Sequence, residues 1–127
     1  MKTRIYILAI ALLAFFSQSC NSVDQDDPEL NELLLSCNAT DPINDLQWLG
    51  DLDAEYEQLW QTYRIMVVEF ERKGYIVLDG TLSSSPASTI FNCNGDVALN
   101  STLKGISYND FIDNMRIVKV LKTKNWP

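Results

Sequence analysis

Residues 63–80 (YRIMVVEFERKGYIVLDG) carry the clearest structural signal in this chain. Residues 63–72 are rich in β-branched and aromatic side chains, and residues 75–79 (YIVLD) form a second run of the same kind. Lys73 and Gly74 lie between the two runs and supply turn chemistry. The sequence therefore predicts a β-hairpin that turns at Lys73-Gly74.

A second hairpin is predicted farther along the chain, where residues 88–93 (STIFNC) and 96–100 (DVALN) flank Asn94-Gly95. Both turn residues tolerate the positive φ that a two-residue type I′ turn requires. Such a turn fixes three facing pairs: Cys93 with Asp96, Asn92 with Val97, and Ile90 with Leu99. Residues 116–123 (RIVKVLKT) are predicted to form a closing strand.

One main helix is predicted to begin at Asp41-Pro42, where a capping residue precedes proline at the first helical position. Apolar residues then recur every three or four positions up to residue 63, and Gly50 indicates a bend or a break in the helix. A shorter helix is expected at 107–114. These elements predict an α+β fold, with the main helix packed on one face of a small antiparallel sheet of four to five strands built from hairpins.

The start of the chain has the pattern of a secretory signal. Lys2 and Arg4 precede a twelve-residue apolar run (residues 5–16), and Ser17-Gln18-Ser19 leads to Cys20. Twelve helical residues span about 18 Å, too little for a bilayer core of about 30 Å. We expect a lipoprotein signal peptide at 1–19, acylation at Cys20, an acidic tether at 20–40 and one domain at 41–127. Ordinary signal peptidase cleavage is the stronger alternative, and a permanent transmembrane helix is the weaker one.

Charge and composition exclude several classes of function. The net charge is −7, and residues 5–63 carry eleven acids and no lysine or arginine. Such a chain is repelled by nucleic acid, which we exclude as a partner. The sequence contains no histidine, so Ser/His and Cys/His nucleophile pairs and His-containing zinc sites are excluded. Its five glycines are scattered singly and form no phosphate-binding loop.

Cys37 and Cys93 remain after Cys20, and an exported chain meets an oxidising compartment. The simplest interpretation is one disulfide. It would close a loop of 57 residues, counting both cysteines, and stabilise the domain by about 4 kcal/mol. Two unpaired thiols remain the alternative, because sequence spacing does not show whether the side chains meet.

Several groups of side chains have the composition of a site, each with a competing structural interpretation. Two acid pairs could perform acid–base chemistry or be solvated: Glu69 with Glu71, and Asp51 with Glu55. Four oxygen donors could suggest calcium, although turn chemistry explains them better: Asn92, Asn94, Asp96 and Asn100. A basic edge could contact an acidic partner or only protect the sheet: Arg116, Lys119, Lys122 and Lys124, with Trp126. Three aromatic residues could form a platform or a core: Trp48, Trp60 and Tyr63.

Five segments, taken in order, resemble a family of small Bacteroidota lipoproteins of uncharacterised function. They are Cys20, DPINDLQWL (41–49), the hairpin around Lys73-Gly74, NCNGD (92–96) and a strand ending in Trp126. Members of that family commonly carry a further cysteine near the turn, which this chain lacks after Cys93. The resemblance implies export, a lipid anchor and an α+β domain, but no activity.

The sequence as a whole leads us to expect a lipid-anchored protein of the bacterial cell envelope. The expected membrane is the outer membrane, and the domain could face either the periplasm or the cell surface. Its partners would be the membrane, through the lipid, and an envelope protein or a polysaccharide. We expect a binding or accessory module rather than an enzyme, with no cofactor and no metal. A carboxylate-dependent hydrolase or carbohydrate-active enzyme, and an inhibitor or immunity-type protein, remain the alternatives.

Overall fold

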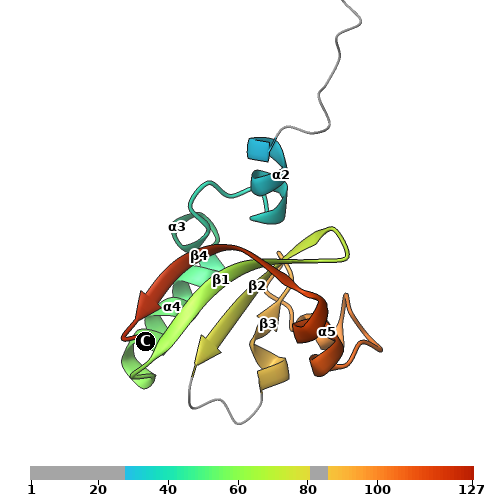
Figure 1. The fold of residues 1–127 in the computed structure, drawn as a ribbon. Helices are drawn as coiled ribbons and strands as arrows, with labels where there is room; N and C mark the ends of the chain where they lie inside the picture. The colour runs from blue at the N-terminus through green and yellow to red at the C-terminus, as the bar shows by residue number, and fades with distance from the viewer. Residues whose placement is uncertain (1–27, 81–85) are drawn as a thin grey trace, which may run out of the picture.

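The computed structural model describes residues 28–80 and 86–127 (Figure 1). The predicted signal peptide, Cys20 and residues 20–27 of the predicted tether lie outside these ranges. Within them, no helix is both long and apolar enough to cross a membrane.

A four-stranded antiparallel sheet forms the centre of the fold and confirms the predicted α+β class. Its strands are β1 (Tyr63–Phe70), β2 (Lys73–Gly80), β3 (Ile90–Phe91) and β4 (Arg116–Lys124), in the order β3-β2-β1-β4. The closing strand β4 therefore pairs with β1 and lies at one edge (Figure 1). The hairpin β1–β2 occupies the middle of the sheet.

The turn of this hairpin is Glu71-Arg72, so the prediction of a turn at Lys73-Gly74 was wrong. Phe70 pairs with Lys73, and the two turn residues have φ values of 50° and 65°. Gly74 lies inside β2 because α2 (Pro28–Leu35) packs closely there: a Cβ at this position would lie 1.8 Å from the carbonyl oxygen of Leu35. The glycine serves close packing rather than chain reversal.

The second predicted hairpin is also wrong in its register and its length. Phe91, and not Asn92, lies opposite Val97, and β3 has only two residues. The Asn92 side-chain oxygen accepts hydrogen bonds from the backbone amides of Asn94 and Asp96, both at 3.0 Å, which favours a longer loop than a type I′ turn. Two short 3-10 helices take up the outer ends of the predicted strands: η1 (Pro86–Thr89) and η2 (Ala98–Asn100).

The helices differ from the single main helix that the sequence predicts. Two helices, α3 (Pro42–Asp45) and α4 (Gln47–Leu59), cover the expected range, and Leu46 separates them in an extended conformation. Gly50 lies within α4 and makes no break. Helix α2 lies inside the segment predicted to be a tether. The short helix α5 (Tyr108–Asn114) is present as predicted, and the Ser107 hydroxyl accepts a hydrogen bond from the Asp110 amide.

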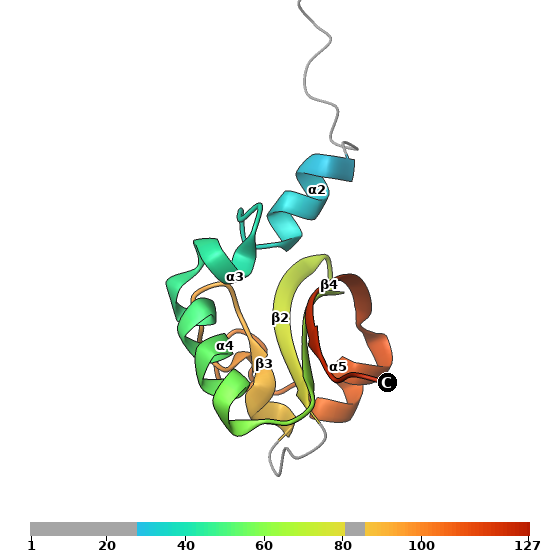
Figure 2. The same ribbon diagram turned by 90° about the vertical axis from the view of Figure 1, so that its left-hand side faces the viewer.

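Both faces of the sheet are covered, whereas the sequence predicted a helix on one face (Figure 2). We call the layer under α4 the α4-side core: Leu49, Tyr63, Ile65, Val67, Ile76, Leu78 and Phe91. The opposite layer, under α5, is the α5-side core: Met66, Val68, Phe70, Tyr75, Val77, Ile90, Ala98, Leu103 and Phe111. Segment 98–115 thus covers the second face. This explains why β1 and β2 read as continuous apolar runs instead of alternating ones.

The predicted disulfide between Cys37 and Cys93 is present, with 5.3 Å between the two Cα atoms. It joins the turn that follows α2 to the loop that follows β3. Because Cys37 lies two residues after the end of α2, the bridge fixes the C-terminal end of that helix to the domain.

The two ends of the β1–β2 turn region should respond oppositely to substitution. Combining Glu71→Asn with Arg72→Gly should raise the free energy of unfolding by about 1 kcal/mol, because asparagine and glycine adopt positive φ more readily. Gly74→Ala should lower it by about 1–3 kcal/mol, because the new methyl group meets the backbone at Leu35. Urea unfolding of the wild type and both variants measures the two effects, and a tolerated Gly74→Ala would contradict the close packing of α2.

Candidate functional site

Two irregularities in β4 turn its basic side chains toward α4. Pairing with β1 shifts register between Ile65 and Met66 and again between Val67 and Val68. Lys119, Lys122 and Lys124 consequently lie opposite Val67, Ile65 and Tyr63, the residues of β1 that face α4. In a regular strand, residues 119 and 122 would point to opposite faces of the sheet. The bulges therefore gather positive charge on one face.

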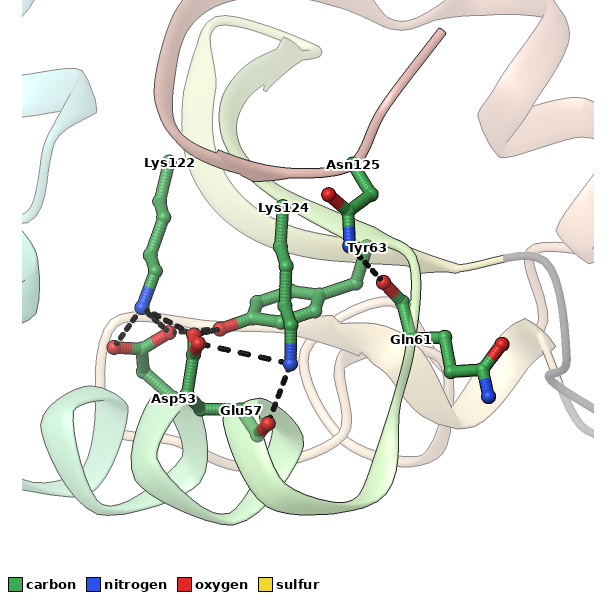
Figure 3. Close-up of polar contacts among 7 residues, drawn as sticks. All are labelled: Asp53, Glu57, Gln61, Tyr63, Lys122, Lys124 and Asn125. Carbon is green, nitrogen blue, oxygen red and sulfur yellow. Dashed lines mark hydrogen bonds and ion pairs between the residues drawn. The ribbon is translucent and has the colours of Figure 1, made fainter.

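Acids of α4 meet these lysines in a compact cluster (Figure 3). Lys122 Nζ lies 2.9 Å from carboxylate oxygens of both Asp53 and Glu57. Lys124 Nζ donates a hydrogen bond to the backbone oxygen of Glu57 at 2.6 Å and lies 3.6 Å from its carboxylate. The buried Tyr63 hydroxyl lies 2.7 Å from Asp53 and 2.9 Å from Glu57. We call these five residues the Lys122 cluster; it pairs two carboxylates with two ammonium groups.

The pKa values within the Lys122 cluster favour the forms that bind one another. Hydrogen bonds from Lys122 and Tyr63 lower the pKa of Glu57 to about 2. Burial, followed by the hydrogen bond to Asp53, raises the pKa of Tyr63. Burial alone would lower the pKa of Lys122, but its hydrogen bonds to Asp53 and Glu57 raise it. At neutral pH Glu57 and Lys122 are therefore charged, and the phenol of Tyr63 is neutral.

The remaining basic residues of β4 are also matched by acids of this chain. Arg116 pairs with Glu69 on β1, and Lys119 lies 3.7 Å from Glu32 of α2. Trp126, at the end of the predicted basic edge, packs under the guanidinium of Arg64 at 4.5 Å. The basic edge is therefore largely an internal contact between β4 and the elements around it.

Neither acid pair predicted from the sequence forms a site. Glu69 pairs with Arg116, while Glu71 lies in the turn; Asp51 and Glu55 are exposed on α4. The acids that do come together, Asp53 and Glu57, have the same spacing of one helical turn. The sequence offered only this spacing of four residues as a signal, and Asp51 with Glu55 shares it. Choosing Asp53 with Glu57 requires knowing which side of α4 faces the sheet.

The asparagine-rich loop is a turn, as the sequence favours. Asn92 binds the loop backbone with its side-chain oxygen and Thr102 Oγ1 with its side-chain nitrogen at 2.8 Å. Asn100 lies in η2, and Asn94 and Asp96 are exposed. In the part of the chain that the structure describes, no three Cys, Asp or Glu side chains are grouped to hold a metal ion.

The aromatic residues predicted as a core or a platform pack against neighbours. Trp48 donates a hydrogen bond from Nε1 to the backbone oxygen of Cys93 at 3.1 Å, and its ring covers Gly95. Trp60 stacks on Tyr56, with 4.5 Å between ring centroids, and covers Gly80. With Tyr63 buried in the Lys122 cluster, all three side chains hold helix α4 and its flanks on the sheet.

A cleft of about 360 Å³, which the sequence did not indicate, lies beside the disulfide. Its walls come from the end of α2, the start of β2 and the loop after β3. The lining side chains and backbone belong to Leu34, Leu35, Arg72, Lys73, Gly74, Tyr75, Asn92, Cys93, Asn94 and Thr102. A second cleft, of about 250 Å³, lies between α2 and Lys119.

Removal of the central cation should destabilise the domain. Lys122 and Asp53 are only 31% and 14% exposed, so Lys122→Met leaves two carboxylates close together without their main cation. We expect a loss of about 1–3 kcal/mol in the free energy of unfolding. Lys119→Met is the matched control: its side chain is 49% exposed with one distant partner, so its effect should stay within about 0.5 kcal/mol. Equal effects in urea unfolding would contradict a structural role for the Lys122 cluster.

The same cluster should contribute to acid sensitivity. Because the folded state lowers the pKa of Glu57 to about 2, its carboxylate stabilises the fold above the ordinary pKa near 4.5, and this stabilisation is lost as pH falls toward 2. Glu57→Gln should therefore cost stability at pH 7 and progressively less between pH 5 and pH 2. Urea unfolding across that range measures the difference. In a Lys122→Met background the pH dependence of the Glu57→Gln effect should shrink.

The chain has no significant similarity to known proteins in sequence or in structure. No protein-family model matches the chain, and neither a curated protein nor a solved structure gives a significant match. Functional conclusions therefore depend on the sequence around Cys20, the Lys122 cluster and the cleft beside the disulfide.

Proposed function

We propose that this chain is a lipid-anchored protein of the bacterial cell envelope whose small α+β domain is a non-enzymatic binding or accessory module. The observation that carries the anchoring is the order of segments in residues 1–20: two basic residues, a short apolar run, small polar residues and Cys20. A diacylated or triacylated cysteine at this position would hold the domain at a membrane surface.

The position of α2 supports a domain held close to its anchor. Only seven residues separate Cys20 from Pro28, where α2 begins. A fully extended chain covers at most about 3.5 Å per residue, so the acylated cysteine would lie within about 28 Å of the helix. The bridge from Cys37 to Cys93 then passes any pull on the anchor directly to the loop after β3.

The state of the Lys122 cluster supports a non-enzymatic role. A general acid or base works best with a pKa near the working pH, whereas Glu57 has a pKa of about 2 and Lys122 has a raised pKa. Each group is also occupied by an opposite charge at about 2.9 Å. These residues are better suited to holding β4 on α4 than to transferring protons.

The cleft beside the disulfide supports a binding role. It combines apolar walls with cationic and neutral polar side chains, the usual composition of a ligand site. The disulfide and the close approach of α2 to Gly74 hold its walls in place. A preformed cleft requires little reorganisation when a ligand enters.

Acylation is directly testable in cells. Labelled fatty acid should be incorporated into the wild-type protein and lost in Cys20→Ala, because the thiol of Cys20 would carry the lipid. Mass spectrometry of the N-terminal peptide should show a modified residue 20 at the start of the mature chain. Ser19→Ala is the control and should remain labelled. An unmodified N-terminus, or label retained in Cys20→Ala, would refute the anchor.

A further inference from the structure

We propose that the cleft beside the disulfide binds a carboxylate attached to an apolar side chain, as found at the C-terminus of a peptide ending in an aliphatic residue. The inference rests on the proposed binding role and names the class of ligand. A free short-chain fatty acid offers the same chemistry, and the two sources can be distinguished by experiment.

The cleft lies where β3 diverges from β2. Ile76 pairs with Phe91 and Val77 with Ile90, and continuing that register would place residues 73–75 opposite residues 92–94. Instead the two segments separate and form opposite walls of the cleft. The last turn of α2 enters the fork from one side, with the Leu35 backbone against Gly74.

Part of the cleft lining is apolar. Leu34 and Leu35 of α2 and the buried Tyr75 of β2 supply it. Leu34 is 54% exposed, so part of the apolar lining of the cleft faces water. An aliphatic side chain placed against Leu34 would remove part of this apolar surface from water.

Two cations that line the cleft have no acidic partner among the residues that the structure describes. Arg72 and Lys73 are exposed there, whereas Arg64 and the four basic residues of β4 are all in ion pairs. Glu71 precedes them in the turn but does not line the cleft. An arginine next to a lysine is suited to a carboxylate, which it can bind through charge-assisted hydrogen bonds.

The turn itself supports a role for these side chains. Glu71 and Arg72 occupy positive φ, where an asparagine followed by a glycine would meet the same geometry with less strain. Non-glycine residues in this conformation commonly cost about 1 kcal/mol or more each. The chain thus keeps a guanidinium at a position where glycine would be the more stable choice.

Neutral donors complete the polar lining. Thr102 Oγ1 accepts a hydrogen bond from Asn92, which leaves its own hydroxyl hydrogen free to donate, and Asn94 also lines the cleft. The volume of about 360 Å³ is near the lower end for ligand pockets and fits one or two residues. We therefore expect dissociation constants between about 10 μM and 1 mM.

The test uses the exported, unreduced protein and three probes: acetyl-Gly-Ala-Leu with a free carboxylate, the same peptide as its C-terminal amide, and hexanoate. Binding is measured from amide chemical shifts of Tyr75 and Thr102 by NMR. The acid should bind at least tenfold more tightly than the amide. The proposal would be overturned if the peptide amide bound as tightly as the peptide acid, or if neither the peptide acid nor hexanoate bound. Binding of hexanoate but not of the peptide acid would support the carboxylate site and identify a free acid as its ligand.

Variants then locate the site. Arg72→Gln combined with Lys73→Gln should weaken binding of the acid at least tenfold, while Lys104→Gln, an exposed lysine outside the cleft, should leave it unchanged. Unchanged binding in the double variant would overturn the assignment. A third variant, Arg72→Gly alone, should raise stability and still weaken binding, a combination that misfolding does not produce.

Failure of the cleft and failure of the anchor are distinguishable. Fatty-acid labelling at Cys20 should be unaffected in all of the cleft variants, because none of them changes the signal at the start of the chain. Conversely, the exported Cys20→Ala protein should bind the peptide acid with the wild-type affinity.

Discussion

The hairpin β1–β2 is buried on both faces, and this burial dictates how the other elements of the domain must pack. Ile65 and Val67 point to one side, and Met66 and Val68 to the other, and all four are buried. A sheet that is apolar on both faces needs a layer on each. Helix α4 supplies one layer, and segment 98–115 with α5 supplies the other, which gives a small chain two separate cores.

Ion pairs hold the edge strand β4 against the helices. Strand β4 is the last strand in the sequence and pairs with β1, and its bulges turn three lysines toward the acids of α4 and α2. The acidic first half of the chain and the more basic second half are thereby brought into contact. The charge asymmetry along the sequence is thus, in large part, an internal complementarity between the helices and the closing strand.

The disulfide and Gly74 together fix the position of helix α2 against the sheet. Leu35 could not approach β2 if residue 74 carried a side chain, and the bridge at Cys37 keeps α2 in that place. This arrangement creates the cleft and leaves Arg72 and Lys73 in its lining. The bridge also links the segment nearest the proposed lipid anchor to the wall of the proposed binding site.

Features that depend on local chemistry were predictable from the sequence, whereas features that depend on distant contacts required the folded structure. Runs of β-branched residues indicated β1, β2 and β4, the segment 107–114 was correctly expected to contain the short helix α5, and two cysteines remaining after Cys20 indicated the bridge. Gly74, which the sequence indicates as a turn residue, instead contacts α2, and the turn lies at residues 71–72. Side-chain hydrogen bonds of Asn92 shape the loop after β3, and the break at Leu46 has no counterpart in the predicted helix. The choice of paired acids on α4 required the rotation of that helix about its axis and the bulges of β4. A one-residue shift in a strand moves every later side chain to the opposite face of the sheet. The spacing of residues in the sequence does not reveal such a shift.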